Sequence, residues 1–163
     1  MTTAAPSALD PTAPEASLPF PVPIPFVEHL GLRLLRWQDG EAVLAFDPAP
    51  EQLNSFSVVH GGVGMTLLDV AMAHAARSVQ PGDWGAITIE MKTSFMRAAV
   101  GPLRVTGKLL HRTATLAFTE AQVCDAQGRL CSHATGTFKY VKRLPVGSKS
   151  SQPLNAAGAV ATD

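Results

Sequence analysis

Residues 60–79 constrain the fold most, because they have the length of a helix and carry apolar side chains almost all round it. At helical spacing, Val63, Leu67, Val70 and Ala71 fall on different faces. A helix without a polar face is stable only when it is buried on every side. The segment therefore predicts an enclosing sheet and, because one small sheet covers a helix incompletely, an oligomer.

Strand-like runs stand on both sides of this helix. Two precede it, and a hairpin turn at Asp39-Gly40 joins them. Four follow it, separated by turn residues. Two strands, one long helix and four strands predict an α+β domain in which an antiparallel sheet wraps around the helix. The predicted strands are residues 30–37, 41–46, 85–97, 101–112, 115–125 and 129–141.

The run 85–97 alternates between two faces, as a strand with one buried face does. The alternation predicts two sets of side chains on opposite faces. One set is Ile87, Ile89, Met91, Thr93 and Phe95, and the other is Thr88, Glu90 and Lys92.

The two ends of the chain differ in composition from its middle. Residues 1–25 are rich in proline, which sustains neither a helix nor a central strand, so they predict a flexible arm. Residues 144–163 show no apolar periodicity and predict a disordered tail. The folded domain is therefore expected at residues 26–143.

Charge and cysteine content narrow the class of protein. Thirteen basic and thirteen acidic residues balance, so nothing indicates a nucleic-acid or membrane-surface partner. The chain begins without the pattern of a signal peptide and has no apolar run of roughly 20 residues, which favours a cytoplasmic location. Cys124 and Cys131 flank an expected hairpin turn and are expected to be reduced thiols rather than a disulfide.

Gly61 and Gly62 fall in the first turn of the predicted helix, after His60. Backbone N–H groups there lack partners in the helix, and with the helix dipole they favour negative charge, as an oxyanion hole does. A glycine-rich turn that packs the helix on a strand explains the same residues. For His60 the alternatives are a functional role and simple capping of the helix.

Asp69 is a carboxylate within the apolar segment, where an ionised group is costly unless it is paired or chemically used. It follows Gly61 by eight residues, or about 12 Å along a helix. Within one chain the two groups cannot serve one reacting carbon. A symmetric dimer with antiparallel helices would bring Asp69 of one chain beside Gly61 of the other, although a capped carboxylate or an interface ion pair is also possible.

Other polar residues give weaker signals. Asn54 suits the orientation of water or a substrate carbonyl, but asparagine also stabilises turns. The remaining histidines show no metal-ligand spacing with cysteine or acidic residues, so no metal site is expected. These histidines are His29, His74, His111 and His133.

With the motif N-S-F-S-V-V-H-G-G-V-G-M-T-L-L-D at 54–69, the chain resembles the hotdog-fold acyl-CoA thioesterases, in particular the PaaI-like phenylacetate-degradation branch. I-T-I-E-M-K-T-S-F-M-R-A-A at 87–99, T-L-A-F-T-E-A at 115–121 and A-T-G-T-F-K-Y at 134–140 extend the likeness over most of residues 28–141. The resemblance implies an antiparallel sheet around one long central helix, in dimers whose sheets join and which often pair into a homotetramer.

By the same resemblance, Asp69 is the acidic catalyst, acting as base toward water or as nucleophile, and Gly61 supplies the amide that polarises the thioester carbonyl. Asn54 and His60 match positions that orient water, substrate and loop, and Thr88 matches a hydroxyl that helps to hold the attacking water.

The resemblance also implies where coenzyme A binds. The candidates near the strand ends that surround the site in the family are Arg97, Arg112 with Thr113, and Lys139. Gly62, beside Gly61 in the first turn of the predicted helix, is a further candidate for substrate binding. Solvated charges at strand ends are the alternative for these residues.

The expected function is hydrolysis of acyl- or aryl-CoA thioesters, with coenzyme A as part of the substrate and no cofactor. A non-catalytic acyl-CoA-binding module and a hotdog dehydratase or hydratase are the alternatives. The hydratases place their acid before a histidine, whereas here His60 precedes Asp69.

Overall fold

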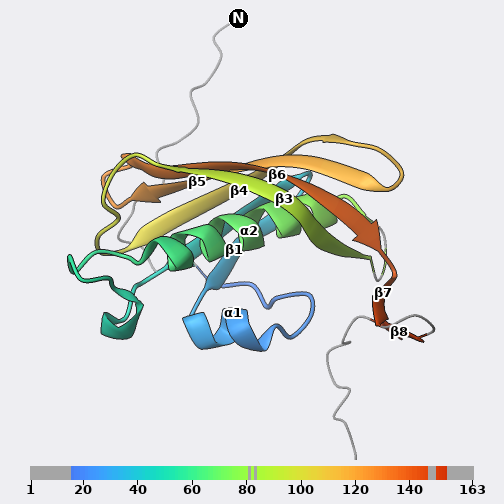
Figure 1. The fold of residues 1–163 in the computed structure, drawn as a ribbon, viewed down its shortest axis with the longest axis horizontal. Coiled ribbons are helices and arrows are strands. Elements are labelled where there is room, and N and C mark those ends of the chain that lie inside the picture. Colours follow the sequence, from blue (N-terminus) through green and yellow to red (C-terminus); the bar gives the residue numbers. More distant parts are fainter. Residues whose placement is uncertain (1–15, 81, 83, 147–149, 154–163) are drawn as a thin grey trace, which may run out of the picture.

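The computed structural model describes residues 16–80, 82, 84–146 and 150–153, and it places helix α2 (Gly61–Arg77) along one six-stranded antiparallel sheet (Figure 1). The sheet order is β1-β2-β4-β5-β6-β3, so β1 and β3 are its edges. The fold class and the long central helix are as predicted. The strands are β1 (Arg33–Gln38), β2 (Glu41–Phe46), β3 (Gly85–Phe95), β4 (Leu103–Arg112), β5 (Leu116–Asp125) and β6 (Leu130–Val141).

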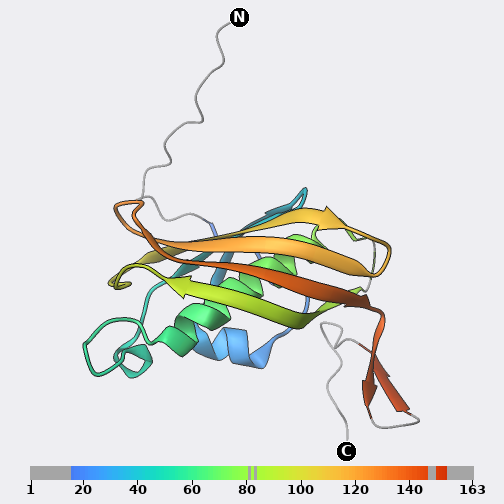
Figure 2. The ribbon, with the colours of Figure 1, turned by 45° about the horizontal axis from the view of Figure 1, so that its top comes forward.

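The sheet curves over α2 (Figure 2). The apolar side chains of the helix are buried beneath it. The closest approach is at Gly107 of β4, where a Cβ atom would lie 2.3 Å from the carbonyl oxygen of Ala71. Helix and sheet therefore touch backbone to backbone at this point, and only glycine fits. The helix side chains that form the core with the sheet are Leu67, Leu68, Val70, Ala71, Met72 and Ala76.

The first hairpin forms at the predicted turn. Asp39 and Gly40 both have positive φ, 53° and 79°, which a two-residue turn between twisted strands requires. The predicted first strand began too early, however, because Leu30 ends helix α1 (Pro25–Leu30). Pro25 opens this helix, and Gly31 closes it in the left-handed conformation with φ 78°.

A β-bulge corrects the predicted faces of β3. The pairing of β3 with β6 shifts between Thr88 and Glu90, so one extra residue, Ile89, interrupts the alternation. Thr88 therefore shares the helix-facing side with Met91, whereas Ile87 pairs with Lys139 on the opposite side. Strict alternation predicted Ile87 and Met91 together and Thr88 on the other face, which is wrong.

The described part of the predicted N-terminal arm contacts the domain. Leu18 forms an isolated bridge to Leu34 on the outer edge of β1, with N–H to O at 2.7 Å. Phe20 and Ile24 pack against the core. Residues 1–15 lie outside the described residues.

After β6, two short strands follow where the sequence predicted a tail without structure. They are β7 (Arg143–Val146) and β8 (Ser150–Pro153), and they pair with each other in antiparallel fashion. The rest of the predicted tail lies outside the described residues. In the part of the chain that the structure describes, no helix has both the length and the apolar character to cross a membrane.

Candidate active site

The loop before α2 is held by Asn54. Its Oδ1 accepts the N–H of Phe56 at 2.8 Å and that of Val58 at 3.4 Å, and its own N–H donates to the carbonyl of Val58. This is the turn-stabilising role of asparagine. Among the described residues no acceptor faces the Nδ2 group of Asn54, and the side chain borders a cavity, so that group is free for a ligand.

His60 caps α2. Its backbone is extended and its Nδ1 accepts the N–H of Gly62 at 3.0 Å, so the imidazole takes up one of the free donors of the first turn. Gly62 N–H is thus engaged within the protein. Gly61 N–H has no acceptor among the described residues and remains available to a substrate oxygen.

A cavity of about 410 Å³ opens beside this first turn, between the 54–60 loop, the helix and the segment 95–99. This volume lies within the range of about 300–1,000 Å³ typical of ligand pockets. Its floor comes from the ends of the central strands. Asn54, His60, Gly61 and Arg97 were predicted as site residues and border the cavity, and Leu103, Val123, Cys131 and Ser132 line its floor.

Asp69 lies two turns further along α2 and is held by β3. Thr88 Oγ1 donates to Asp69 Oδ1 at 2.7 Å, which the bulge at Ile89 makes possible by turning Thr88 toward the helix. Partial burial raises the pKa of Asp69 above its usual value, and the hydrogen bond from Thr88 opposes the rise. The carboxylate is therefore a stronger base than an aspartate in water.

Asp69 does not border the cavity at Gly61, which agrees with the helical rise of about 12 Å between them. It lies instead on a partly exposed stripe of α2 beside β3. The other members of this stripe are Gly62, Met65, Thr66 and Ala73, and Met65 is 41% exposed. The candidate catalytic groups of one chain thus stand at two separate places on one helix.

The residues predicted to bind the coenzyme A phosphates also divide into two groups. Arg97 borders the cavity and donates to the carbonyl of Leu130 at 3.1 Å. The other group lies at the far end of the sheet: Arg112 ends β4, Thr113 follows it, and Lys139 pairs with Ile87 and with Leu116 at the start of β5. Thr113 Oγ1 accepts the N–H groups of two following residues, so it shapes the turn to β5.

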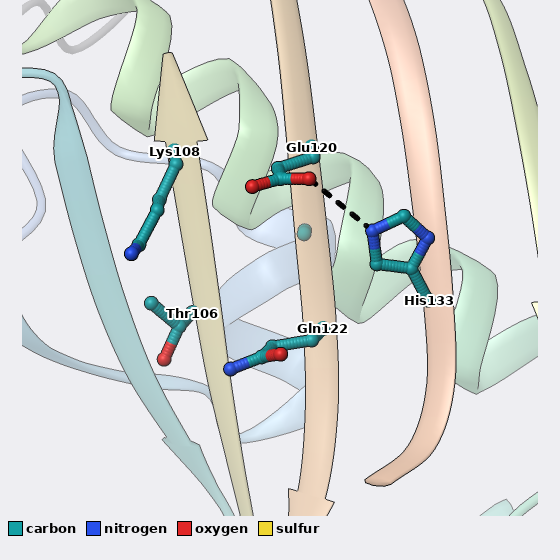
Figure 3. A pocket seen from close by; sticks show the side chains of 6 residues that line it. Thr106, Lys108, Glu120, Gln122 and His133 are labelled. Atoms are coloured by element: carbon teal, nitrogen blue, oxygen red, sulfur yellow. Dashed lines mark hydrogen bonds and ion pairs between the residues drawn. The ribbon is translucent and has the colours of Figure 1, made fainter. Parts of the chain in front are cut away.

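A second, smaller hollow lies on the sheet face turned away from α2 (Figure 3). Its walls are Thr106 and Lys108 of β4, Glu120 and Gln122 of β5, and His133 of β6. His133 Nε2 and Glu120 Oε2 are 3.4 Å apart. With a volume of about 80 Å³, this hollow is far below the usual size of a ligand pocket.

Sequence reasoning missed the buried floor of the cavity. Cys131 is a free thiol, as expected, but it lines the cavity at the point where β5 and β6 shift register. Such irregular pairing has no sequence signal, so the contribution of Cys131 and Ser132 was not predictable. In the described part of the chain, no three side chains of His, Cys, Asp or Glu are grouped to hold a metal ion.

Comparison with known proteins agrees with this arrangement. The sequence profile of the Thioesterase superfamily matches residues 56–132. A relative from Saccharolobus solfataricus, named "Putative esterase", is 29% identical over 123 residues, which are 75% of this chain and 86% of that protein.

Solved structures show the same fold. A conserved protein of Pseudomonas aeruginosa is 29% identical with a TM-score of 0.70, covering 74% of this chain and 96% of that one. A mutant form of the phenylacetic acid degradation protein PaaI of Thermus thermophilus is 26% identical with a TM-score of 0.65, covering 71% and 98%. From its motifs, its helix-and-sheet architecture and these matches, the chain has the hotdog fold, matches the Thioesterase superfamily over residues 56–132 and is similar to the PaaI proteins.

Proposed function

We propose that this protein hydrolyses acyl- or aryl-CoA thioesters to the free acid and coenzyme A. The match to the Thioesterase superfamily over residues 56–132 supports thioester hydrolysis in general. The observation that carries the proposal is the partly buried Asp69 carboxylate of α2, which accepts a hydrogen bond from Thr88 of the edge strand β3. Among the described residues no cation pairs with this carboxylate, and burying its charge costs stability, so a partly accessible carboxylate held by one hydroxyl supports a chemical role.

The reaction needs the carboxylate and an oxyanion donor. As general base, Asp69 takes a proton from water while the water oxygen attacks the thioester carbon; as nucleophile, its own oxygen attacks, and water then cleaves the acyl anhydride. In both routes the carbonyl oxygen becomes negative and Gly61 N–H at the helix start stabilises it. The C–S bond then breaks, and the coenzyme A thiolate takes up a proton.

A dimer brings these groups together. The outer edge of β1 is partly covered by Leu18, whereas the described residues leave the outer edge of β3 without a partner strand. Edge-to-edge pairing of β3 with a second copy would also cover the stripe of α2 that carries Met65 and Asp69. With antiparallel helices, each Asp69 then faces the Gly61 end of the other chain.

The same arrangement supports a binding path for coenzyme A across the dimer. Arg97 stands at the Gly61 end of each chain, and Arg112 and Lys139 stand toward the other end. Pairing of two dimers into a tetramer, as the family resemblance implies, belongs to the same proposal and is checked by the mass of the particle in solution.

The test is thiol release from a panel of aryl- and fatty acyl-CoAs by the wild type, Asp69→Ala and Glu90→Gln. Glu90 is the control, because it is a carboxylate on β3, the strand that carries Thr88, and its Oε1 accepts from Thr137 on the sheet face turned away from α2. We expect release by the wild type and Glu90→Gln, and a loss of about a hundredfold or more in Asp69→Ala. A fully active Asp69→Ala would contradict the proposal, and a wild type that binds the esters without hydrolysis would indicate a binding module.

A further inference from the structure

The ring of Phe95 lies over the first turn of α2. Phe95 is the last residue of β3, and its ring atoms lie 3.6 Å and 3.4 Å from the positions that Cβ atoms on Gly61 and Gly64 would take. The ring borders the cavity, yet 54% of the residue surface is exposed. The ring of Phe95 thus packs on the first turn of α2 at the place where Gly61 borders the cavity.

The lining of the cavity fits an apolar group. Leu103, Val123 and Cys131 form a buried floor, and among the described residues that line it Arg97 alone carries a full charge, already bonded to the carbonyl of Leu130. Phosphates bind where several charged groups and backbone donors converge. Here Arg97 is the single charged side chain among the described lining residues, and most of the other lining residues are apolar. The chemistry of the walls therefore suits the acyl part of a thioester and not its nucleotide part.

Backbone hydrogen bonds hold part of the cavity wall. The N–H groups of Met96 and Arg97 donate to the carbonyl of Cys131, and Val59 N–H donates to the carbonyl of Ala99. These bonds fix the segment after β3 to the floor and to the 54–60 loop. Phe95 pairs with Ser132 at the end of β3, so its backbone is held by the sheet, while its exposed ring can be shortened without filling or emptying the buried core.

We propose that Phe95 is a specificity-determining residue that limits the size of the acyl group bound beside Gly61. The inference rests on the proposed thioester hydrolysis and adds where the acyl group lies and what bounds it. Replacement by a smaller side chain enlarges the cavity next to the reacting carbonyl, so larger acyl groups gain contacts that short ones do not use. A pocket that gains or loses one methylene contact changes discrimination by about tenfold or more.

The experiment measures kcat/KM for acetyl-, butyryl-, hexanoyl-, octanoyl- and decanoyl-CoA with the wild type, Phe95→Ala and Phe95→Leu. Phe118→Ala is the matched control, because Phe118 is a partly exposed phenylalanine that stacks on His111 and does not border the cavity. We expect the ratio of decanoyl to butyryl kcat/KM to rise by about tenfold or more in Phe95→Ala, to rise less in Phe95→Leu, and to stay constant in Phe118→Ala.

An unchanged ratio in folded, active Phe95→Ala and Phe95→Leu overturns the inference while the proposed function stands. Should Phe95→Ala not fold, Phe95→Leu decides by the same ratio. A wild type that releases no thiol from any ester overturns both. Sedimentation of each variant is measured alongside, and a ratio that moves only together with loss of the dimer also overturns the role of Phe95 in the acyl cavity.

Discussion

The two halves of α2 meet the rest of the chain in opposite ways. The first half borders the cavity, leaves Met65 exposed and carries the half-buried Asp69. The second half is closed: His74 is 2% exposed, its Nδ1 donates to the carbonyl of Val70 at 2.8 Å, and Phe20 and Trp37 pack against its ring. One half is built for access and the other for packing.

Both halves contain a group whose pKa is shifted by burial, and the comparison teaches what such a shift means. Burial raises the pKa of Asp69 and lowers that of His74 to about 4. Asp69 lies on the partly exposed stripe of α2, whereas His74 is 2% exposed and its Nε2 has no partner in the described chain. A shifted pKa therefore indicates chemistry only where the group is accessible.

The largest effect is expected at the open end, from Gly61→Pro. Proline is favoured at the first position of a helix, and the extended backbone of His60, with ψ 137°, suits a following proline. The substitution replaces the N–H that we assign to the oxyanion hole with the ring carbon Cδ, so kcat for thioester hydrolysis should fall by about a hundredfold to a thousandfold.

Gly61→Ala is the control, because it keeps the N–H and its Cβ would make an ordinary contact with Phe95 at 3.6 Å. Both variants should unfold at close to the wild-type temperature. Equal kcat values for the two variants would remove Gly61 N–H from the mechanism.

At the closed end, His74→Leu should change the pH dependence of stability and not activity at neutral pH. The pKa of His74 is lower in the folded chain than in the unfolded one, so its neutral state favours folding fully above about pH 6.5. As the pH falls toward 4, the unfolded chain binds the proton first, and up to about 3 kcal/mol of stability is lost. Nearby Arg77 adds to the cost of protonation.

Denaturant unfolding of the wild type and His74→Leu between about pH 7.5 and 4.5 measures this contribution. The wild type should lose more unfolding free energy on acidification than the variant. Parallel curves would mean that His74 titrates alike in the folded and unfolded chain.

Alanine substitutions at two glycines compare how tightly the two halves of α2 are packed. Gly107→Ala places a Cβ 2.3 Å from the carbonyl oxygen of Ala71, so helix and sheet must separate, at a cost of about 1–3 kcal/mol. Gly64→Ala meets only the ring of Phe95 at 3.4 Å, and the higher helix propensity of alanine should stabilise by up to about 1 kcal/mol. Thermal unfolding checks the two signs, and a destabilised Gly64→Ala beside an unaffected Gly107→Ala would invert the comparison.

The smallest effect is expected from Thr88→Val. The hydrogen bond from Thr88 lowers the pKa of Asp69, so its removal should raise that pKa and move the acidic limb of the kcat profile to higher pH. Thr88→Ser, which keeps the hydroxyl, should leave the limb in place. A limb that does not move in Thr88→Val would indicate that another group controls the rate at acidic pH.

Features set by local chemistry were predictable from the sequence. Turn residues predict the Asp39-Gly40 turn, and helix capping predicts the start of α2 after His60. Apolar periodicity predicts the order of strands and helix along the chain. The positions of Asp69 and Gly61 on one helix followed from the helical rise, and so did the expectation of a shared site.

Features set by tertiary packing were not predictable. The bulge at Ile89 reverses the faces of β3, and neither propensity nor periodicity carries a sign of it. Thr88 was expected at the site through family resemblance, while the pattern of its own strand placed it on the wrong face. Helix α1 was not predicted, because proline dominates the segment before it. The cavity floor at Cys131 was not predicted either, because it arises from a register shift between β5 and β6.

The most direct test of the shared site is complementation between two inactive variants. Asp69→Asn keeps Gly61 N–H, and Gly61→Pro keeps the Asp69 carboxylate, so a mixed dimer contains one intact site if the site spans the interface. Refolding or co-expressing the two chains in equal amounts should restore about a quarter of the wild-type activity, because half of the dimers are mixed and each has one working site of two. Activity no greater than the sum of the two variants alone would show that each chain carries its own complete site, and would contradict the account.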